Sequence, residues 1–84
     1  MLSIAEMKPE DLPEVLAIEE ASFSTPWTRG MFMVEMSLAH SRMRVLHTVD
    51  SEGVSGVAGY ICSWHVSDEV HIHDLAVHPS FRRK

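Results

Sequence analysis

Apolar and polar positions follow a helical period in the first third of the chain. Four apolar residues recur at helical spacing, namely Leu12, Val15, Leu16 and Ile18. The acids between them are expected to face solvent, namely Glu14, Glu19 and Glu20. Residues 8–11 place Pro9 in a first turn with acids near the positive end of the helix dipole. The pattern predicts a helix from this turn to about Ala21.

A second helix is predicted after a break in the pattern. The segment 23–28 contains a proline and two aromatic residues, and either Thr25 or Thr28 is suited to cap the following helix. Four apolar residues continue that helix, namely Met31, Val34, Met36 and Leu38. Gly30 weakens it near its start, and His40 and Ser41 are interpreted as its end.

The remaining pattern is typical of strands. A short strand is predicted over residues 2–7, and longer ones over 44–49 and 54–64. Residues 50–53 supply the turn of a hairpin. Gly56 and Gly59 inside the third strand indicate a bulge or a close approach of another backbone.

The last strand is predicted from Val70, after a turn over residues 66–69. It is expected to be a nearly continuous buried run, from the apolar residues Val70, Ile72, Leu75 and Val77. Pro79 cannot donate to a sheet, so the strand should end at or before His78. Because the turns between strands are short, neighbouring strands should be antiparallel. The fold class expected is therefore α+β, with a strand, two helices and a three-strand antiparallel meander.

Composition narrows the class of protein. A chain of 84 residues forms one domain at most, and its net charge of −5 argues against a general nucleic-acid binder. Cys62 is the only cysteine, so no internal disulfide is possible and a reducing compartment is favoured. The start has no signal-peptide pattern, and no apolar run reaches the ~20 residues that a membrane span needs. A cytoplasmic, soluble protein without a membrane partner is expected.

Three cations follow the last predicted strand: Arg82, Arg83 and Lys84. Ligands commonly bind near the carboxyl ends of strands in α/β proteins, and arginine there suggests a phosphate. Taken alone, terminal cations are more often a solvated tail.

Residues 75–79, Leu-Ala-Val-His-Pro, and 81–84, Phe-Arg-Arg-Lys, resemble the acetyl-CoA-binding strand and turn of the GNAT acyltransferases. Further matches are Ile18-Glu19 followed by Phe23 and Pro26-Trp27, then residues 58–60 and 69–72. Together they are most similar to the ribosomal-protein-alanine N-acetyltransferases. The resemblance covers residues 1–84 but only the first half of a family domain, and Lys84 is reached before the glycines of the pyrophosphate loop.

The resemblance implies roles for individual residues. The backbone of Leu75, Ala76 and Val77 would pair with the pantetheine arm of acetyl-CoA, with Arg82, Arg83 and Lys84 beginning the pyrophosphate loop. The side chains of Leu75 and Val77 could also simply be core.

Phe23, Pro26 and Trp27 would border the groove for the acceptor, a protein or peptide amino terminus such as that of a ribosomal protein. The alternative role for Trp27 is to pin the second helix to the sheet.

The acids nearest the expected cleft are Glu69 and Asp74. The family's base and acid come from its later half, so the catalytic residues are unknown here, with Glu69 as a secondary base or else a plain turn carboxylate. The chain alone is therefore expected to be inactive. Cys62 is expected to be a small buried residue.

Other functions remain open. The four histidines at 65, 71, 73 and 78 suggest a metal site. Zinc usually needs three or four ligands, but only His71 and His73 share a strand face at close spacing, so no metal is expected. A non-catalytic binding or dimerisation module that uses the exposed edge of the last strand is the main alternative.

Overall fold

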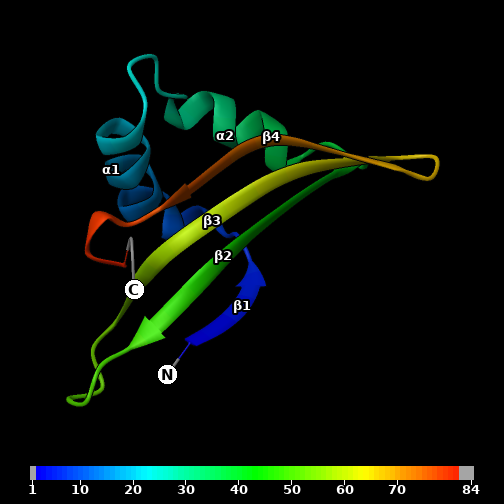
Figure 1. Ribbon diagram of the computed structural model, residues 1–84. Coiled ribbons are helices and arrows are strands. Elements are labelled where there is room, and N and C mark those ends of the chain that lie inside the picture. Colours follow the sequence, from blue (N-terminus) through cyan, green and yellow to red (C-terminus); the bar gives the residue numbers. More distant parts are fainter. Residues whose placement is uncertain (1, 82–84) are drawn as a thin grey trace.

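The computed structural model describes residues 2–81 and has the predicted α+β architecture (Figure 1). In chain order the strands and helices are β1 (Leu2–Glu6), α1 (Leu12–Ser22), α2 (Arg29–Met36), β2 (Ser41–Val49), β3 (Ser55–Val66) and β4 (Glu69–Val77). Short 3-10 helices, Pro9–Asp11 and Pro79–Phe81, precede α1 and follow β4. The strands form one antiparallel sheet in the order β1-β2-β3-β4. The prediction of a strand, two helices and a three-strand meander is confirmed.

Both helices pack on the same face of the sheet, and the core lies between the helices and that face (Figure 1). Phe32 is the buried residue of α2, and its ring lies edge-on to Tyr60 of β3 at 6.0 Å between centroids. The sheet contributes further buried side chains, chiefly Met43, Val45, Val57 and Cys62. The helical period had drawn attention to Met31 and Val34 instead, but both are exposed.

Two contacts made by Asp11 fix the start of α1. Its carboxylate accepts from the backbone amide of Lys8 at 2.8 Å and contacts Nε2 of His47 at 2.9 Å. The helix is therefore tied both to its own first turn and to β2.

Thr28, one of the two candidate caps, is the N-cap of α2. Its Oγ1 accepts from the amide of Met31 at 3.2 Å, while its own backbone is extended. The strand after this helix begins at Ser41 rather than at Arg44, so Ser41 belongs to β2 and not to the end of the helix.

A bulge interrupts β3 where the two strand glycines predicted one. The β2–β3 pairing passes from Leu46 opposite Gly59 to His47 opposite Val57, which leaves Ala58 as the extra residue. The predicted close approach of another backbone is found at Gly59, since a Cβ there would lie 3.0 Å from the carbonyl oxygen of Ala76.

A second bulge lies in β4 and changes which side chains are buried. Pairing passes from Cys62 opposite Asp74 to Ser63 opposite Ile72, so His73 is the extra residue. An alternating strand would put Ile72 and Leu75 on opposite faces, but the bulge puts them on the same one.

The expectation of a buried apolar run in β4 is wrong. Four side chains are between 40% and 58% exposed, namely Val70, Ile72, Leu75 and Val77. The bulge turns them to the face of the sheet opposite the helices, and no other element among residues 2–81 covers that face. We call this surface the bare face; it also carries Leu2, Ile4, Leu46 and Ile61.

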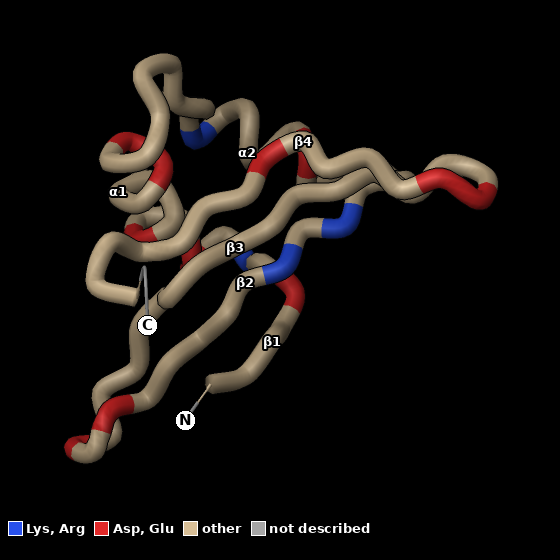
Figure 2. Tube along the Cα trace, viewed as in Figure 1, with Lys and Arg blue, Asp and Glu red and all other residues tan. Residues whose placement is uncertain are grey.

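Charge is unevenly distributed along the fold (Figure 2). Acidic residues lie along α1 and in both hairpin turns, while basic residues lie on β2 and at the start of α2. Within residues 2–81, no helix is long and apolar enough to cross a membrane.

Candidate functional site

The outer edge of β4 holds the three residues whose backbone is predicted to pair with acetyl-CoA, and that role stays a prediction. The amide of His78 donates to the carbonyl of Ala58 at 2.7 Å. Because an antiparallel ladder alternates between bonded and non-bonded pairs, Leu75 and Val77 then direct their backbone groups away from β3. Ala76 differs, because it lies opposite Tyr60 as a bonded pair and buries its side chain. Packing therefore accounts for Ala76, while Leu75 and Val77 are not core residues.

A hollow of about 290 Å³ adjoins this edge on the bare face. Gly59 lies opposite Val77 and has no side chain, which leaves space between Leu46 and Val77. Arg44 also lines the hollow and is the one cation there among the described residues.

Asp74 of β4 is a buried acid on the face of the sheet that the helices cover, opposite Cys62. Its Oδ1 accepts from the amide of Leu75 at 3.0 Å, and its Oδ2 is buried without a donor among residues 2–81. Burial, and after it the neighbouring Glu19 carboxyl, raise the pKa of Asp74 to about 7, although the hydrogen bond from Leu75 acts in the opposite direction. The sequence offered a signal for this position, because the apolar spacing in β4 changes phase between Ile72 and Leu75, which indicates a bulge.

Glu19 is the second buried acid, and the prediction that it faces solvent is wrong. Its side chain is on the inner face of α1, and the residue is only 1% exposed. Oε2 accepts from the amide of Trp27 at 2.9 Å, and Oε1 accepts from the Tyr60 hydroxyl at 2.5 Å. Glu19 follows Val15 by four residues, a spacing that places both on one helix face. That spacing was the available signal.

The pKa of the Tyr60 hydroxyl is raised by its buried position beside Glu19. Burial raises its pKa above the ordinary value, and the hydrogen bond to Glu19 adds to the effect. Tyr60 therefore remains a neutral donor across the physiological pH range.

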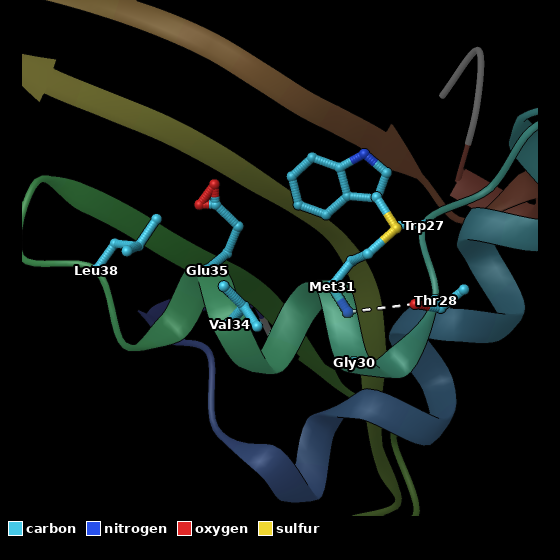
Figure 3. A pocket seen from close by; sticks show the side chains of 7 residues that line it. All are labelled: Trp27, Thr28, Gly30, Met31, Val34, Glu35 and Leu38. Carbon is cyan, nitrogen blue, oxygen red and sulfur yellow. Dashed lines mark hydrogen bonds between the residues drawn. The ribbon is translucent and has the colours of Figure 1, made fainter.

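The loop before α2 holds the residues predicted to border the acceptor groove. Trp27 packs against Phe32 at 5.1 Å between centroids, so it does connect α2 to the core. It also lines a groove of about 550 Å³ along α2 (Figure 3). In that view the side chains of Met31, Glu35 and Leu38 follow Trp27 along the same side of the helix. Trp27 thus anchors α2 and lines this groove, while its role beside an acceptor stays a prediction.

The other residues of this loop are less enclosed. Phe23 is 38% exposed and Pro26 is half-buried. Neither lines the groove, so the structure brings only Trp27 of the three to it.

Glu69 lies away from the buried acids, at the start of β4. It pairs with Val66 beside the hairpin turn and contacts Nε2 of His71 at 3.0 Å on the surface. Its role as a base stays a prediction. Arg82, Arg83 and Lys84 lie outside the described residues.

The histidines of the sheet are engaged separately. The His73 ring packs on Trp64 at 4.2 Å between centroids, and His65 contacts Ser63 at 3.1 Å. In the part of the chain that the structure describes, no three potential metal ligands gather.

Cys62 is fully buried in β3, as expected. Burial raises the pKa of its thiol to about 11. It therefore lacks the thiolate character and the access that a nucleophile needs.

The comparisons with known proteins identify the class. The acetyltransferase (GNAT) family model matches residues 12–84. The chain therefore belongs to the GNAT acetyltransferase family, which confirms the sequence-based prediction.

Individual relatives make the match more specific. The chain is 31% identical over 83 residues to a Bacillus subtilis (strain 168) protein named as a ribosomal protein bS18-alanine N-acetyltransferase, covering 95% of this chain and 50% of that protein. The crystal structure of the ribosomal-protein-S18-alanine N-acetyltransferase from Escherichia coli matches with a TM-score of 0.76 and 23% identity, over 99% of this chain and 50% of that one. The chain is thus similar to ribosomal-protein-alanine N-acetyltransferases, and it spans about half the length of both relatives.

Proposed function

We propose that this chain contributes the acetyl-CoA-binding half of an N-acetyltransferase that acts on the amino terminus of a protein or peptide in the cytoplasm. A ribosomal protein is the proposed acceptor, because the relatives carry that name. The observation that carries the proposal is the outer edge of β4, where Leu75 and Val77 direct backbone groups away from the sheet.

These residues suit acetyl-CoA. A pantetheine arm has amide groups that can pair with a strand edge, as an added strand would. The glycine opposite Val77 leaves space beside that edge. Arg82, Arg83 and Lys84 are proposed to attract the pyrophosphate, because guanidinium and ammonium groups pair well with phosphate oxygens.

When bound, acetyl-CoA supplies an activated thioester. The neutral amine of the acceptor forms a bond to the acetyl carbon as the carbon–sulfur bond breaks; the amine loses a proton and the departing sulfur gains one. The β4 edge at Leu75 and Val77 would hold the acetyl group, and Trp27 would border the acceptor groove. Direct transfer is favoured over an acyl-enzyme, because Cys62 is buried and protonated.

The chain alone is proposed to be inactive, because it spans about half the length of its relatives. Glu69 remains a secondary base candidate, but its carboxylate is beside the hairpin turn. The principal acid and base are proposed to lie in the half of the relatives that this chain does not span.

Calorimetric titration of the 84-residue chain with acetyl-CoA tests cofactor binding. We expect binding that weakens by about tenfold when Arg82→Ala and Arg83→Ala are combined, because two charge-assisted contacts to phosphate are lost. Arg42→Ala is the matched control, since Arg42 is an exposed cation on β2 and should leave the affinity unchanged. Absence of binding, or equal weakening by the control, would refute the assigned cofactor edge.

Mass spectrometry of a peptide with an amino-terminal alanine tests transfer. We expect no acetylation by the chain alone with acetyl-CoA, and the same peptide with a blocked amine serves as the control for side-chain acetylation. Acetylation confined to the free amine would show that the chain is active by itself.

A second candidate function is a non-catalytic protein-binding or dimerisation module. The bare face favours it, because exposed apolar side chains of β1 and β4 flank the half-buried Leu46 and Ile61 on β2 and β3. Binding of acetyl-CoA discriminates between the two candidates.

A further inference from the structure

Two buried carboxyl groups connect the acceptor side of the proposed site to its acetyl-CoA side. Glu19 on α1 accepts from the amide of Trp27 at 2.9 Å, which holds the loop before α2. Asp74 on β4 accepts from the amide of Leu75 at 3.0 Å, which holds the outer edge of the sheet. Both acids are less than 10% exposed, Glu19 at 1% and Asp74 at 7%.

One oxygen of these two carboxyl groups lacks a hydrogen-bond donor among the described residues. Oδ2 of Asp74 is buried and has no donor among residues 2–81. Asp74 lies opposite the buried Cys62 on the face of the sheet that α1 contacts, and the Glu19 carboxyl of α1 acts on it through a hydrogen bond and its charge. Two carboxylate oxygens both accept, so they repel each other unless one carries a proton. A single shared proton supplies the missing donor and removes the repulsion.

We propose that Glu19 and Asp74 are positioning residues which share one proton across the contact between α1 and β4, and so hold the Trp27 loop and the Leu75 backbone in a fixed relation. Neither acid touches the reacting atoms in this proposal. Its meaning for acetyl transfer rests on the proposed function, since the loop would border the acceptor and the β4 edge would hold acetyl-CoA. Loss of the shared proton leaves two adjacent carboxylates, which would push the two segments apart.

The other titratable groups around the pair stay neutral near pH 7 or act from further away. Tyr60 and Cys62, both on β3, have raised pKa values because they are buried. Glu35 on α2 acts on Cys62. The charge change expected at this interface near neutral pH is therefore that of the acid pair, whose Asp74 member has a pKa raised to about 7.

The test is an NMR pH titration of the 84-residue chain from about pH 5 to about pH 9. The Asp74 carboxyl carbon and the amide signals of Trp27 and Leu75 are followed together. We expect all three to shift with one common midpoint, near pH 7. An Asp74 midpoint near its ordinary value of about 4, or separate midpoints for the two amides, would overturn the proposal. This wild-type measurement does not depend on the folding of any variant.

Two variants isolate the pair from the six histidines, which can titrate in the same range. Asp74→Asn keeps an acceptor for Leu75 and puts a permanent donor towards Glu19, so the step should vanish from both amides. Glu20→Gln changes an exposed carboxylate one residue further along α1 and should leave the step in place. A step that persists in Asp74→Asn contradicts the proposal. Because the titration needs no acetyl-CoA, its result is independent of whether the cofactor binds.

Discussion

At the scale of single residues, the Tyr60 hydroxyl and the Glu19 carboxylate form a buried polar contact. The hydroxyl donates at 2.5 Å from the middle of β3 to the inner face of α1. A buried acceptor that loses its donor costs about 1–3 kcal/mol. This contact therefore contributes both to stability and to the orientation of α1 on the sheet.

Tyr60→Phe should lower the free energy of unfolding by about 1–3 kcal/mol, because Oε1 of Glu19 loses its donor while the ring contact with Phe32 is kept. Urea unfolding followed by circular dichroism measures it. Ser37→Ala is the control, since its exposed hydroxyl donates only to a backbone carbonyl, and a change within about 0.5 kcal/mol is expected. Equal effects of the two variants would contradict this prediction.

The raised pKa of Asp74 predicts how stability depends on pH. Between the ordinary aspartate value of about 4 and the folded value of about 7, the folded chain keeps a proton that the unfolded chain releases. The contribution of Asp74 to the free energy of unfolding therefore falls as pH rises through this window, by at most about 1.4 kcal/mol per pH unit, and is constant above it.

The measurement is urea unfolding at several pH values for the wild type and for Asp74→Asn. The difference between the two proteins isolates Asp74 from every other ionisable group. The wild type should lose stability relative to the variant as pH rises from about 4 to about 7. Parallel curves for the two proteins would show that Asp74 titrates normally.

At the scale of the elements, the cap of α2 gives a direct comparison. Thr28→Ala should cost about 1 kcal/mol, because Oγ1 no longer accepts from the amide of Met31. Thr25→Ala is the matched control, since Thr25 is exposed and does not begin the helix. Thermal unfolding followed by circular dichroism measures both. A larger effect at Thr25 would mean that the helix begins earlier than the structure shows.

The order and type of the elements were predictable from sequence because each depends on local pattern. The helical spacing from Leu12 to Ile18, the turn at 50–53 and Pro79 after β4 each act within a few residues. The glycines at 56 and 59 likewise located the first bulge correctly.

The features that the sequence did not reveal depend on which surface covers which. Glu19 was expected to face solvent because acids are seldom buried. Its burial depends on hydrogen bonds from the Tyr60 hydroxyl and the Trp27 amide, which come from other parts of the chain. The apolar residues of β4 were assigned to the core because a hydrophobic run usually indicates burial. Their exposure follows from the bulge at His73, and a pattern of apolar positions alone does not show to which face of the sheet a bulge turns them.

At the scale of the whole molecule, the bare face and the open edge of β4 favour self-association. Exposed apolar side chains on one face of a sheet, beside an edge strand, are a ready surface for a second copy. The 84-residue chain should therefore show a sedimentation coefficient that rises with concentration. A monomer at every concentration would argue against association.

Ile4→Lys tests which surface is responsible, because Ile4 is 71% exposed on the bare face and a lysine there should shift the chain towards monomer. Val54→Lys is the control, since Val54 is similarly exposed but lies in the β2–β3 turn. Equal effects would indicate a general effect of charge rather than a specific surface.

The burial of Cys62 has a practical consequence. Since its thiol is enclosed in β3 between two partner strands and its pKa is raised to about 11, a thiol reagent should reach it only when the sheet opens. The rate of modification then measures the opening of the sheet directly, with no added label and no second cysteine to confuse it. We expect modification far slower than that of an unfolded peptide thiol and strongly accelerated by urea. Reaction at the peptide rate would mean that the sheet opens freely.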